Sequence, residues 1–396
     1  MLELKRTYGQ LAPTERLLIG PGPNGTDPRV LRAMSTPVLG HLDPEFLGIM
    51  NETGELLRYV FQTENELTLP LSGTGTAGMD AVLLNLLEAG DKAIIATCGA
   101  FGDRMVEIAK RCGAEVKVVQ GEWGRIIEAE QVEAAFKEMP DAKLLAMVHA
   151  ETSTGILQPV EEMVKIAHAN GALFVADCVT SLGGAPLFID EWGIDAAYSG
   201  TQKCLSCPPG LSPVTFNTRA REALQKRRTQ VPSYYLDLTM IERYWGKERF
   251  YHHTAPVSNV YGFREALLIV AEEGLEARWA RHRVNANAFI AGIEALGLEP
   301  FAQADHRLPS LITVKVPEGV EDAAVRKYLL EQLNIEIGGG LGAVKGKIWR
   351  VGFMGYNSNR KNVLLGLSSL ASALNAQGFK ASATEAIAAA DAVYKG

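Results

Sequence analysis

An aspartate and a lysine are the residues of this chain whose surroundings best suit chemistry. Asp177 ends the apolar run 173–176, and Lys203 follows a second apolar stretch, 196–198, after a turn of small residues. A short apolar run bounded by turn residues is typical of a buried strand in a parallel sheet. Such sheets bind ligands outside the carboxyl ends of their strands. We therefore expect the carboxylate and the amine to face one crevice and to act on opposite sides of one bound molecule.

A glycine-rich turn lies upstream at 72–80, with the sequence SGTGTAGMD. It follows a predicted strand and opens a predicted helix, so its backbone N–H groups can bind a phosphate. The hydroxyls of Thr74 and Thr76 add donors. Taken alone, the turn is explained equally well by a tight strand-to-helix connection. The glycines that match the pattern G-x-G-x-x-G are Gly73, Gly75 and Gly78.

A dinucleotide site would require an acid at the end of the following strand, to hold a ribose. The strand there ends in Thr97 and Cys98, so the turn favours a single phosphate monoester. A nicotinamide-dependent dehydrogenase is therefore the least favoured reading.

The three features together indicate more than each does separately, because a lone acid or lysine is usually a solvated surface residue. A phosphate cradle, a lysine that can form an imine and a carboxylate that can pair with a pyridinium nitrogen are the parts of a pyridoxal-phosphate site. Cys204 and Cys207 form a C-x-x-C pair, but no second pair exists to complete a zinc site, so we predict no metal.

Eight strings carry a resemblance to a known family, in an order and spacing that make it specific. They are GPGP at 20–23, GHLDPEF at 40–46, SGTGTAG at 72–78, HAETSTGILQP at 149–159, ADCVTSLGG at 176–184, YSGTQKCLSCPPG at 198–210, YHHTAPVS at 251–258 and WRVGFMG at 349–355. Over about residues 16–378 the chain resembles the class V pyridoxal-phosphate aminotransferases of fold type I. Within that class it is most similar to the alanine–glyoxylate and serine–glyoxylate aminotransferases.

The resemblance implies that Lys203 forms the imine with the cofactor and that Asp177 pairs with its ring nitrogen. It also implies cofactor contacts from Thr74, Gly75, Thr76, Gln202, Phe101, Thr152 and Val179. The first four would hold the phosphate. The phenylalanine, where many relatives have tryptophan, would stack on one ring face and the valine would pack on the other. Thr152 would hydrogen-bond the ring hydroxyl.

Further residues are implied by the same resemblance. Tyr251 and Thr254 would reach the phosphate of a neighbouring subunit, which makes a homodimer with shared active sites the expected state. Arg350 would bind the substrate α-carboxylate, since its planar fork suits bidentate recognition. The residues expected near the rest of the substrate are Gly22, His41 and Asn259.

The implied reaction is transamination from a small L-amino acid, alanine first, to glyoxylate, with small amino-acid and oxoacid substrates as partners. Serine and ureidoglycine remain alternative donors, because a related branch reads ureidoglycine with a glutamine and an asparagine. Asn259 fits that pattern and His41 does not. A lyase or desulfurase of the same fold is less favoured, because the cysteines directly after Lys203 are poorly placed for a mobile loop.

Composition agrees with an ordinary enzyme. The 396 residues are 47% hydrophobic and 21% charged, with a formal net charge of -7, which does not favour nucleic-acid binding. No apolar run is long enough for a membrane span, and the first residues are too polar for a secretory signal. Five irregularly spaced cysteines suggest a reducing, cytoplasmic setting.

Between 67 and 216 predicted strands alternate with predicted helices, which indicates a three-layer α/β fold with a doubly wound, mainly parallel sheet. A smaller α+β domain is expected at the C-terminus. We place the boundaries at 1–16 for an N-terminal arm, 17–273 for the cofactor-binding domain and 274–396 for the small domain. Two further expectations are an irregular excursion over 227–258 and one long helix over 259–297.

Overall fold

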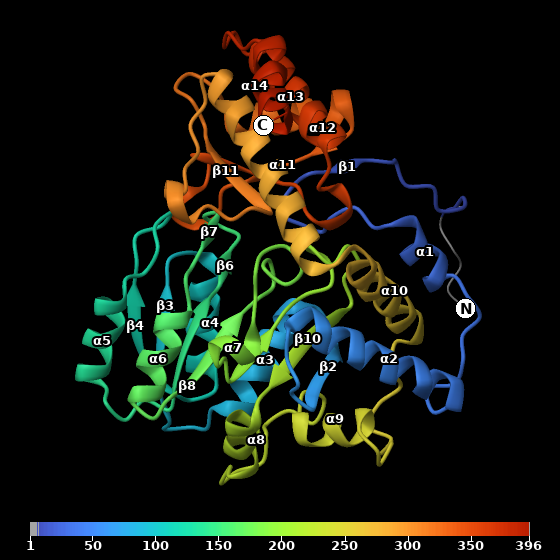
Figure 1. Ribbon diagram of the computed structural model, residues 1–396, viewed down its shortest axis with the longest axis vertical. Coiled ribbons are helices and arrows are strands. Elements are labelled where there is room, and N and C mark those ends of the chain that lie inside the picture. Colours follow the sequence, from blue (N-terminus) through green and yellow to red (C-terminus); the bar gives the residue numbers. More distant parts are fainter. Residues whose placement is uncertain (1–5, 7, 396) are drawn as a thin grey trace.

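A seven-stranded sheet forms the centre of the larger domain (Figure 1). The computed structural model describes residues 6 and 8–395. The strand order is β2-β10-β9-β8-β5-β3-β4, and β10 alone runs antiparallel to its neighbours. The strands are β2 (Leu67–Ser72), β3 (Lys92–Thr97), β4 (Glu115–Gln120), β5 (Leu144–Val148), β8 (Leu173–Asp177), β9 (Ala196–Tyr198) and β10 (Leu211–Phe216).

Helices cover both faces of this sheet, because its central strands are apolar on both sides. Along β3, Ile94 and Ala96 pack into one core, while Ala93 and Ile95 pack into the other. The first face is covered by α2 (Pro44–Phe61), α5 (Ala129–Glu138), α6 (Glu161–Ala169) and α10 (Val257–Glu273). The second is covered by α3 (Gly75–Leu86), α4 (Ala100–Arg111), α8 (Thr218–Gln225) and α9 (Leu238–Trp245). The predicted three-layer, doubly wound architecture is confirmed.

The carboxyl ends of β2, β3, β5, β8 and β9 lie at the same edge of the sheet, since these strands run in one direction. β10 begins at that edge, with Leu211 opposite Ser72 at the end of β2. The loop before β10 is also tied there, because Gly73 N donates to Gly210 O over 3.0 Å. The segments that follow these five strands and the loop that precedes β10 therefore meet at one edge of the sheet.

The smaller domain lies above that edge in Figure 1. Its antiparallel sheet has the order β11-β14-β13 and is covered by four helices around Phe289, Trp349 and Phe353. The strands are β11 (Leu311–Lys315), β13 (Gly338–Gly339) and β14 (Ile348–Gly352), and the helices are α11 (Leu275–Ala295), α12 (Asp322–Leu333), α13 (Arg360–Asn375) and α14 (Ala383–Lys395). The shorter elements of the chain are β1 (Leu17–Leu18), α1 (Pro28–Met34), β6 (Ala150–Glu151), β7 (Ile156–Leu157), α7 (Ile189–Trp192) and β12 (Ile335–Glu336).

Two local expectations were wrong. The single helix expected over 259–297 is two helices, α10 and α11, which meet at Gly274. Its φ of 80° is a left-handed conformation that ends the first helix. The excursion expected to be irregular contains α9, whose N-cap Asp237 accepts a hydrogen bond from Thr239 N.

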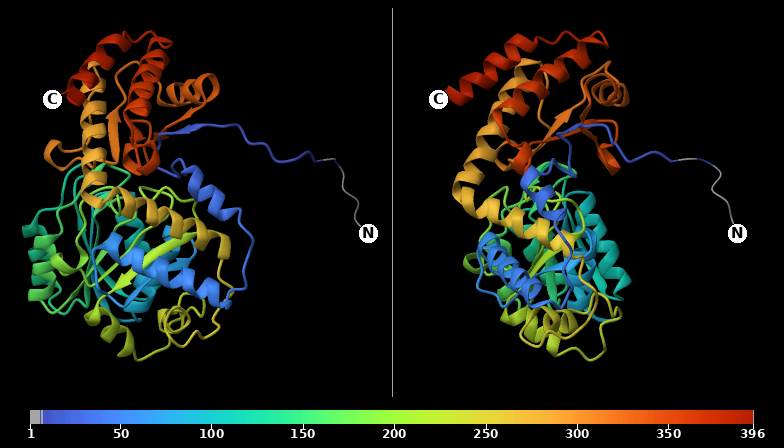
Figure 2. Two further views of the ribbon diagram at one scale, coloured as in Figure 1. Left: turned by 45° about the vertical axis from the view of Figure 1, so that its right-hand side comes forward. Right: turned by 90° about the vertical axis from the view of Figure 1, so that its right-hand side faces the viewer.

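The N-terminal arm leaves the body of the molecule as an extended segment (Figure 2). Its described part has no regular secondary structure before β1, which pairs in parallel with β12 of the smaller domain. The exact domain boundaries stay a prediction. Within residues 6 and 8–395, no helix has the length and apolar character that crossing a membrane would require.

Candidate active site

Asp177 lies at the end of β8 and is 2% exposed. Val179 N donates to its Oδ1 over 2.8 Å, and the hydroxyl of Tyr198 donates to its Oδ2 over 2.8 Å. Burial raises the pKa of Asp177 to about 6, although these two hydrogen bonds act in the opposite direction. A carboxylate held this firmly is prepared to pair with a cationic ring nitrogen.

Lys203 lies beyond the end of β9 and is 8% exposed. Burial, assisted by the positive charge of Arg350, lowers its pKa to about 8. Its Nζ donates to the backbone oxygen of Pro21. A Cβ atom at Gly22, where φ is 101°, would lie 2.8 Å from the lysine Cδ and 2.9 Å from Nζ. Glycine at this position therefore leaves the space that the amine occupies.

The phosphate turn forms the N-terminus of α3, with Thr74 as the N-cap residue. Both Thr74 and Thr76 are exposed, and Thr74 makes no side-chain capping bond, so the hydroxyls and the first N–H groups of the helix are open to a ligand. A Cβ atom at Gly75 would lie 3.4 Å from Val179 Cγ2, which places the turn beside the strand end that carries Asp177.

Gln202 and Thr152 border the same space. The side-chain oxygen Oε1 of Gln202 is buried and has no hydrogen-bond partner in the described part of the chain. Thr152 is buried, with its Oγ1 2.5 Å from that of Thr180. A buried amide group without its full set of partners is expected where a ligand completes the hydrogen bonding.

Phe101 stands at the start of α4, beyond the end of β3. Sequence reasoning missed the residue that holds this segment, Glu151. Its Oε2 accepts from Phe101 N and Gly102 N, each over 3.2 Å, and its Oε1 accepts from Ser153. Burial raises the pKa of Glu151 to about 7. Its position beside Thr152 in the string HAETSTGILQP was the available signal.

Arg350 comes from β14 of the smaller domain and is 7% exposed. Its Nε donates to Gly339 O over 2.8 Å, and no ion pair involves it within residues 6 and 8–395. Burial lowers its pKa to about 10, which the negative charge of Glu151 opposes. A buried guanidinium without a carboxylate partner suits a ligand that brings one.

Three further predicted residues, Tyr251, Thr254 and His41, lie together. Tyr251 is 54% exposed, with its hydroxyl 3.4 Å from Thr254 Oγ1 and its ring 4.9 Å from that of His41. Asn259 packs against the loop before β10, where a Cβ at Gly210 would lie 2.0 Å from its Nδ2. Tyr251 and Thr254 are exposed, and their expected contact with another subunit stays a prediction.

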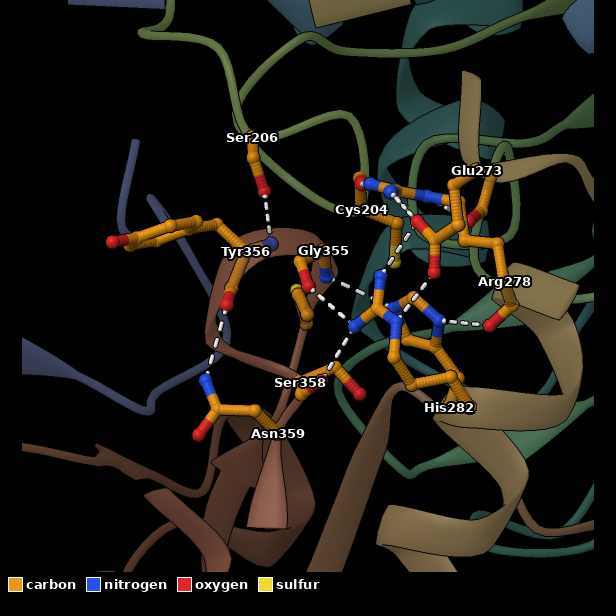
Figure 3. A network of polar contacts seen from close by, with 12 residues as sticks. Cys204, Ser206, Glu273, Arg278, His282, Gly355, Tyr356, Ser358 and Asn359 are labelled. Atoms are coloured by element: carbon orange, nitrogen blue, oxygen red, sulfur yellow. Dashed lines mark hydrogen bonds and ion pairs between the residues drawn. The ribbon is translucent and has the colours of Figure 1, made fainter. Parts of the chain in front are cut away.

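A buried polar network connects the loop after Lys203 to the smaller domain (Figure 3). Arg278 and Arg281 on α11 both pair with Glu273. His282 accepts from Gly355 N over 2.9 Å, and Ser206 accepts from Tyr356 N over 2.7 Å. These residues were not predicted, because no local pattern marks a network that joins segments so distant in sequence.

The thiols of the C-x-x-C pair are buried. Burial raises the pKa of Cys204 to about 11 and that of Cys207 to about 12, which disfavours the thiolate that redox chemistry or metal binding needs. Among the residues that the structure describes, no group of three acidic, histidine or cysteine side chains is arranged to hold a metal.

These side chains fit pyridoxal phosphate. The exposed helix N-terminus with its hydroxyls suits the phosphate, the buried carboxylate suits the ring nitrogen, and the buried amine suits the aldehyde. Arg350 remains free for a substrate carboxylate.

Comparisons with known proteins agree with this interpretation. The (S)-ureidoglycine–glyoxylate transaminase of Bacillus subtilis is 42% identical over 398 residues, covering 96% of this chain and 95% of that protein. The alanine–glyoxylate aminotransferase of Rattus norvegicus is 41% identical over 352 residues, covering 88% and 85%. The crystal structure of an alanine–glyoxylate aminotransferase from Nostoc sp. matches with a TM-score of 0.92 and 47% identity, covering 93% and 98%.

The model of the family described as aminotransferase class-V matches residues 31–363. That range contains the phosphate turn, Asp177, Lys203 and Arg350, which are the parts of the crevice described above. The cofactor of this family is pyridoxal phosphate, and a dehydrogenase is accordingly excluded. The chain belongs to the class-V aminotransferases.

Proposed function

We propose that this aminotransferase moves the amino group of a small L-amino acid, alanine first, to glyoxylate, giving glycine and an oxoacid. The observation that carries the proposal is that each domain contributes one buried cationic group. These are the amine of Lys203 and the guanidinium of Arg350, which has no ion-pair partner within the described chain. Glyoxylate appears in the names of both the Bacillus subtilis and the Rattus norvegicus enzymes, which are 42% and 41% identical to this chain.

Each residue has a task that follows from its surroundings. When bound, pyridoxal phosphate supplies an electron-withdrawing ring that stabilises negative charge at the substrate α-carbon. Lys203 Nζ moves the α-proton, and its lowered pKa makes the neutral amine accessible near neutral pH. The Asp177 carboxylate keeps a proton on the ring nitrogen, and Arg350 holds the α-carboxylate so that the α-proton faces the lysine.

Ureidoglycine is the second candidate donor, favoured by the Bacillus subtilis relative and by Asn259. His41 favours alanine or serine as the donor instead, because the related branch that acts on ureidoglycine shares the asparagine of this chain but not the histidine. His41 lies beside Tyr251, the residue expected to reach a second subunit, and Asn259 packs against Gly210, which is hydrogen-bonded to Gly73 of the phosphate turn.

A homodimer is therefore part of the proposal. The exposed hydroxyls of Thr74 and Thr76 leave one side of the phosphate turn open, and the exposed pair Tyr251 and Thr254 has hydroxyls to offer. The extended arm carries Leu11, which is 94% exposed and suits burial against a second subunit. Sedimentation of the holoenzyme tests this, and a monomer with full activity would contradict it.

The donor is identified by a half-reaction screen. The cofactor-loaded protein is mixed with alanine, serine or ureidoglycine, and the absorbance of its imine band is followed; glyoxylate is then added. We expect one small donor to bleach the band stoichiometrically and glyoxylate to restore it. Lys203→Ala is the matched control, and it should show no borohydride-sensitive band. Repeated turnover of an amino acid without any oxoacid would overturn transamination in favour of a lyase.

A further inference from the structure

Arg104 connects two segments of the cofactor site that are separate in sequence. It is the fifth residue of α4, and its Nη1 donates to Thr76 Oγ1 of the phosphate turn over 3.2 Å. Its guanidinium carbon lies 5.0 Å from the centroid of the Phe101 ring. The guanidinium thus stands between the phosphate turn and the aromatic residue expected to stack on the cofactor.

The positive charge of Arg104 is not neutralised by an acidic side chain within the described chain. No ion pair involves it within residues 6 and 8–395, whereas Arg111 on the same helix pairs with Glu107 over 2.9 Å. The positive charge of Arg104 nevertheless acts on both Asp177 and Lys203: it opposes the rise that burial causes in the pKa of Asp177 and adds to the fall that burial causes in that of Lys203. The same positive charge also opposes the rise that burial causes in the pKa of the Asp80 carboxyl, on α3.

The phosphate turn itself lacks a full positive charge. A phosphate monoester carries about -1.5 to -2 charges near neutral pH. The donors of the turn are backbone N–H groups, the hydroxyls of Thr74 and Thr76 and the amide of Gln202, and a helix N-terminus contributes only about +0.5 charge. A cation beside this turn would therefore balance charge that the neutral donors cannot.

We propose that Arg104 is the residue that compensates the charge of the cofactor phosphate, acting directly on its oxygens and by orienting the Thr76 hydroxyl. The inference deepens the proposed function, on which it rests for the identity of the bound cofactor. The competing explanation is that Arg104 only packs on Phe101 and supports the ring platform.

Two ligands separate these explanations. Pyridoxal phosphate and pyridoxal share the ring and the aldehyde, but only the first has a phosphate. Dissociation constants of both are measured for the cofactor-free wild type and for Arg104→Met, Arg104→Lys and Arg111→Met. We expect Arg104→Met to weaken pyridoxal phosphate by about ten- to hundredfold and pyridoxal by less than about twofold, because one charge-assisted contact is lost. Arg104→Lys should restore part of the loss.

Inorganic phosphate provides an independent measurement. It should raise the apparent dissociation constant of pyridoxal phosphate for the wild type and do so much less for Arg104→Met. Arg111→Met, on the same helix, should match the wild type throughout, and equal melting temperatures would show that the variants are folded.

Equal weakening of both ligands by Arg104→Met would overturn the proposal and establish the packing role. Unchanged affinity for pyridoxal phosphate would also overturn it. These measurements do not involve transamination, so a failure of the proposed function would appear differently, as a wild type that binds pyridoxal phosphate and does not transfer an amino group.

Discussion

Arg278 donates a hydrogen bond from Nη2 to the backbone oxygen of Cys204 over 2.5 Å, directly after the lysine of the active site. One turn along α11, Arg281 donates to Gly355 O over 2.9 Å, in the loop that follows β14. Glu273 pairs with both arginines. The loop after Lys203 and the loop after the strand that carries Arg350 are therefore both bonded to one helix, α11.

Removing the Arg281 end of this connection should weaken substrate binding more than it slows the chemical step. In Arg281→Met the loop after β14 loses its bonds to Gly355 O and Ser358 O. We expect KM for the amino donor to rise about tenfold, with a smaller change in kcat, because a small displacement of Arg350 weakens carboxylate binding. Steady-state kinetics measure this. The control is Arg283→Met, an exposed residue of the same helix, and equal kinetics of the two variants would contradict the coupling.

Arg350 should contribute to binding of the substrate carboxylate and not to binding of the cofactor. We expect Arg350→Gln to lower kcat/KM for the amino donor by about 10²- to 10³-fold, since charged hydrogen bonds contribute roughly 1.5–3 kcal/mol and their geometry is lost as well. Cofactor affinity should not change. Arg350→Lys should recover only part, because an ammonium group cannot bind bidentately. Titration with pyridoxal phosphate and kinetics on one preparation test both points, and weakened cofactor binding would refute the assignment.

The buried carboxylate of Asp177 should lower the unfolding free energy of the cofactor-free protein at high pH. Its folded pKa of about 6 lies above the ordinary value of 3.8 for an aspartate, so this group favours the folded state at low pH and loses that contribution as pH rises through 6. We expect Asp177→Asn to stabilise the cofactor-free protein at pH 8 by about 1–2 kcal/mol and to abolish transamination. Urea unfolding at pH 4 and pH 8 measures this. A stabilisation that is the same at both values would contradict it.

His282 should make the protein sensitive to mild acid. Its Nε2 accepts from Gly355 N and its Nδ1 lies 2.8 Å from Arg278 O, and burial lowers its pKa from 6.5 to about 3. Between these values the unfolded chain binds a proton that the folded chain does not, so stability falls as pH falls, by at most about 1.4 kcal/mol per unit. The difference in unfolding free energy between the wild type and His282→Gln should shrink from pH 6.5 to pH 4. A constant difference would exclude this histidine as the cause.

The alternation of strands and helices could be predicted from sequence, because buried parallel strands are short apolar runs with clear boundaries. The same reasoning placed Asp177 and Lys203 at or just beyond strand ends, and the structure has both there, close enough for the charge of each to act on the pKa of the other. Their chemical roles, the dimer and the cytoplasmic location stay predictions.

Other features carried weaker signals. The direction of β10 was not specified, although the segment 199–210 contains no helix and parallel neighbours need a crossover. The break at Gly274 interrupts no hydrophobic periodicity, so one helix was expected. Arg104 was missed because its function depends on a turn in another part of the chain, and a single exposed arginine on a helix is ordinary.

The close approach of Gly22 to Lys203 has a consequence for related chains. Any side chain at position 22 would enter the volume of the lysine amine, even in a protein that keeps the lysine, the aspartate and the phosphate turn. A homologue with a larger residue there should fold and retain the recognisable motifs while its lysine is displaced from the aldehyde. Glycine at position 22 is thus expected wherever a relative keeps its lysine in this place.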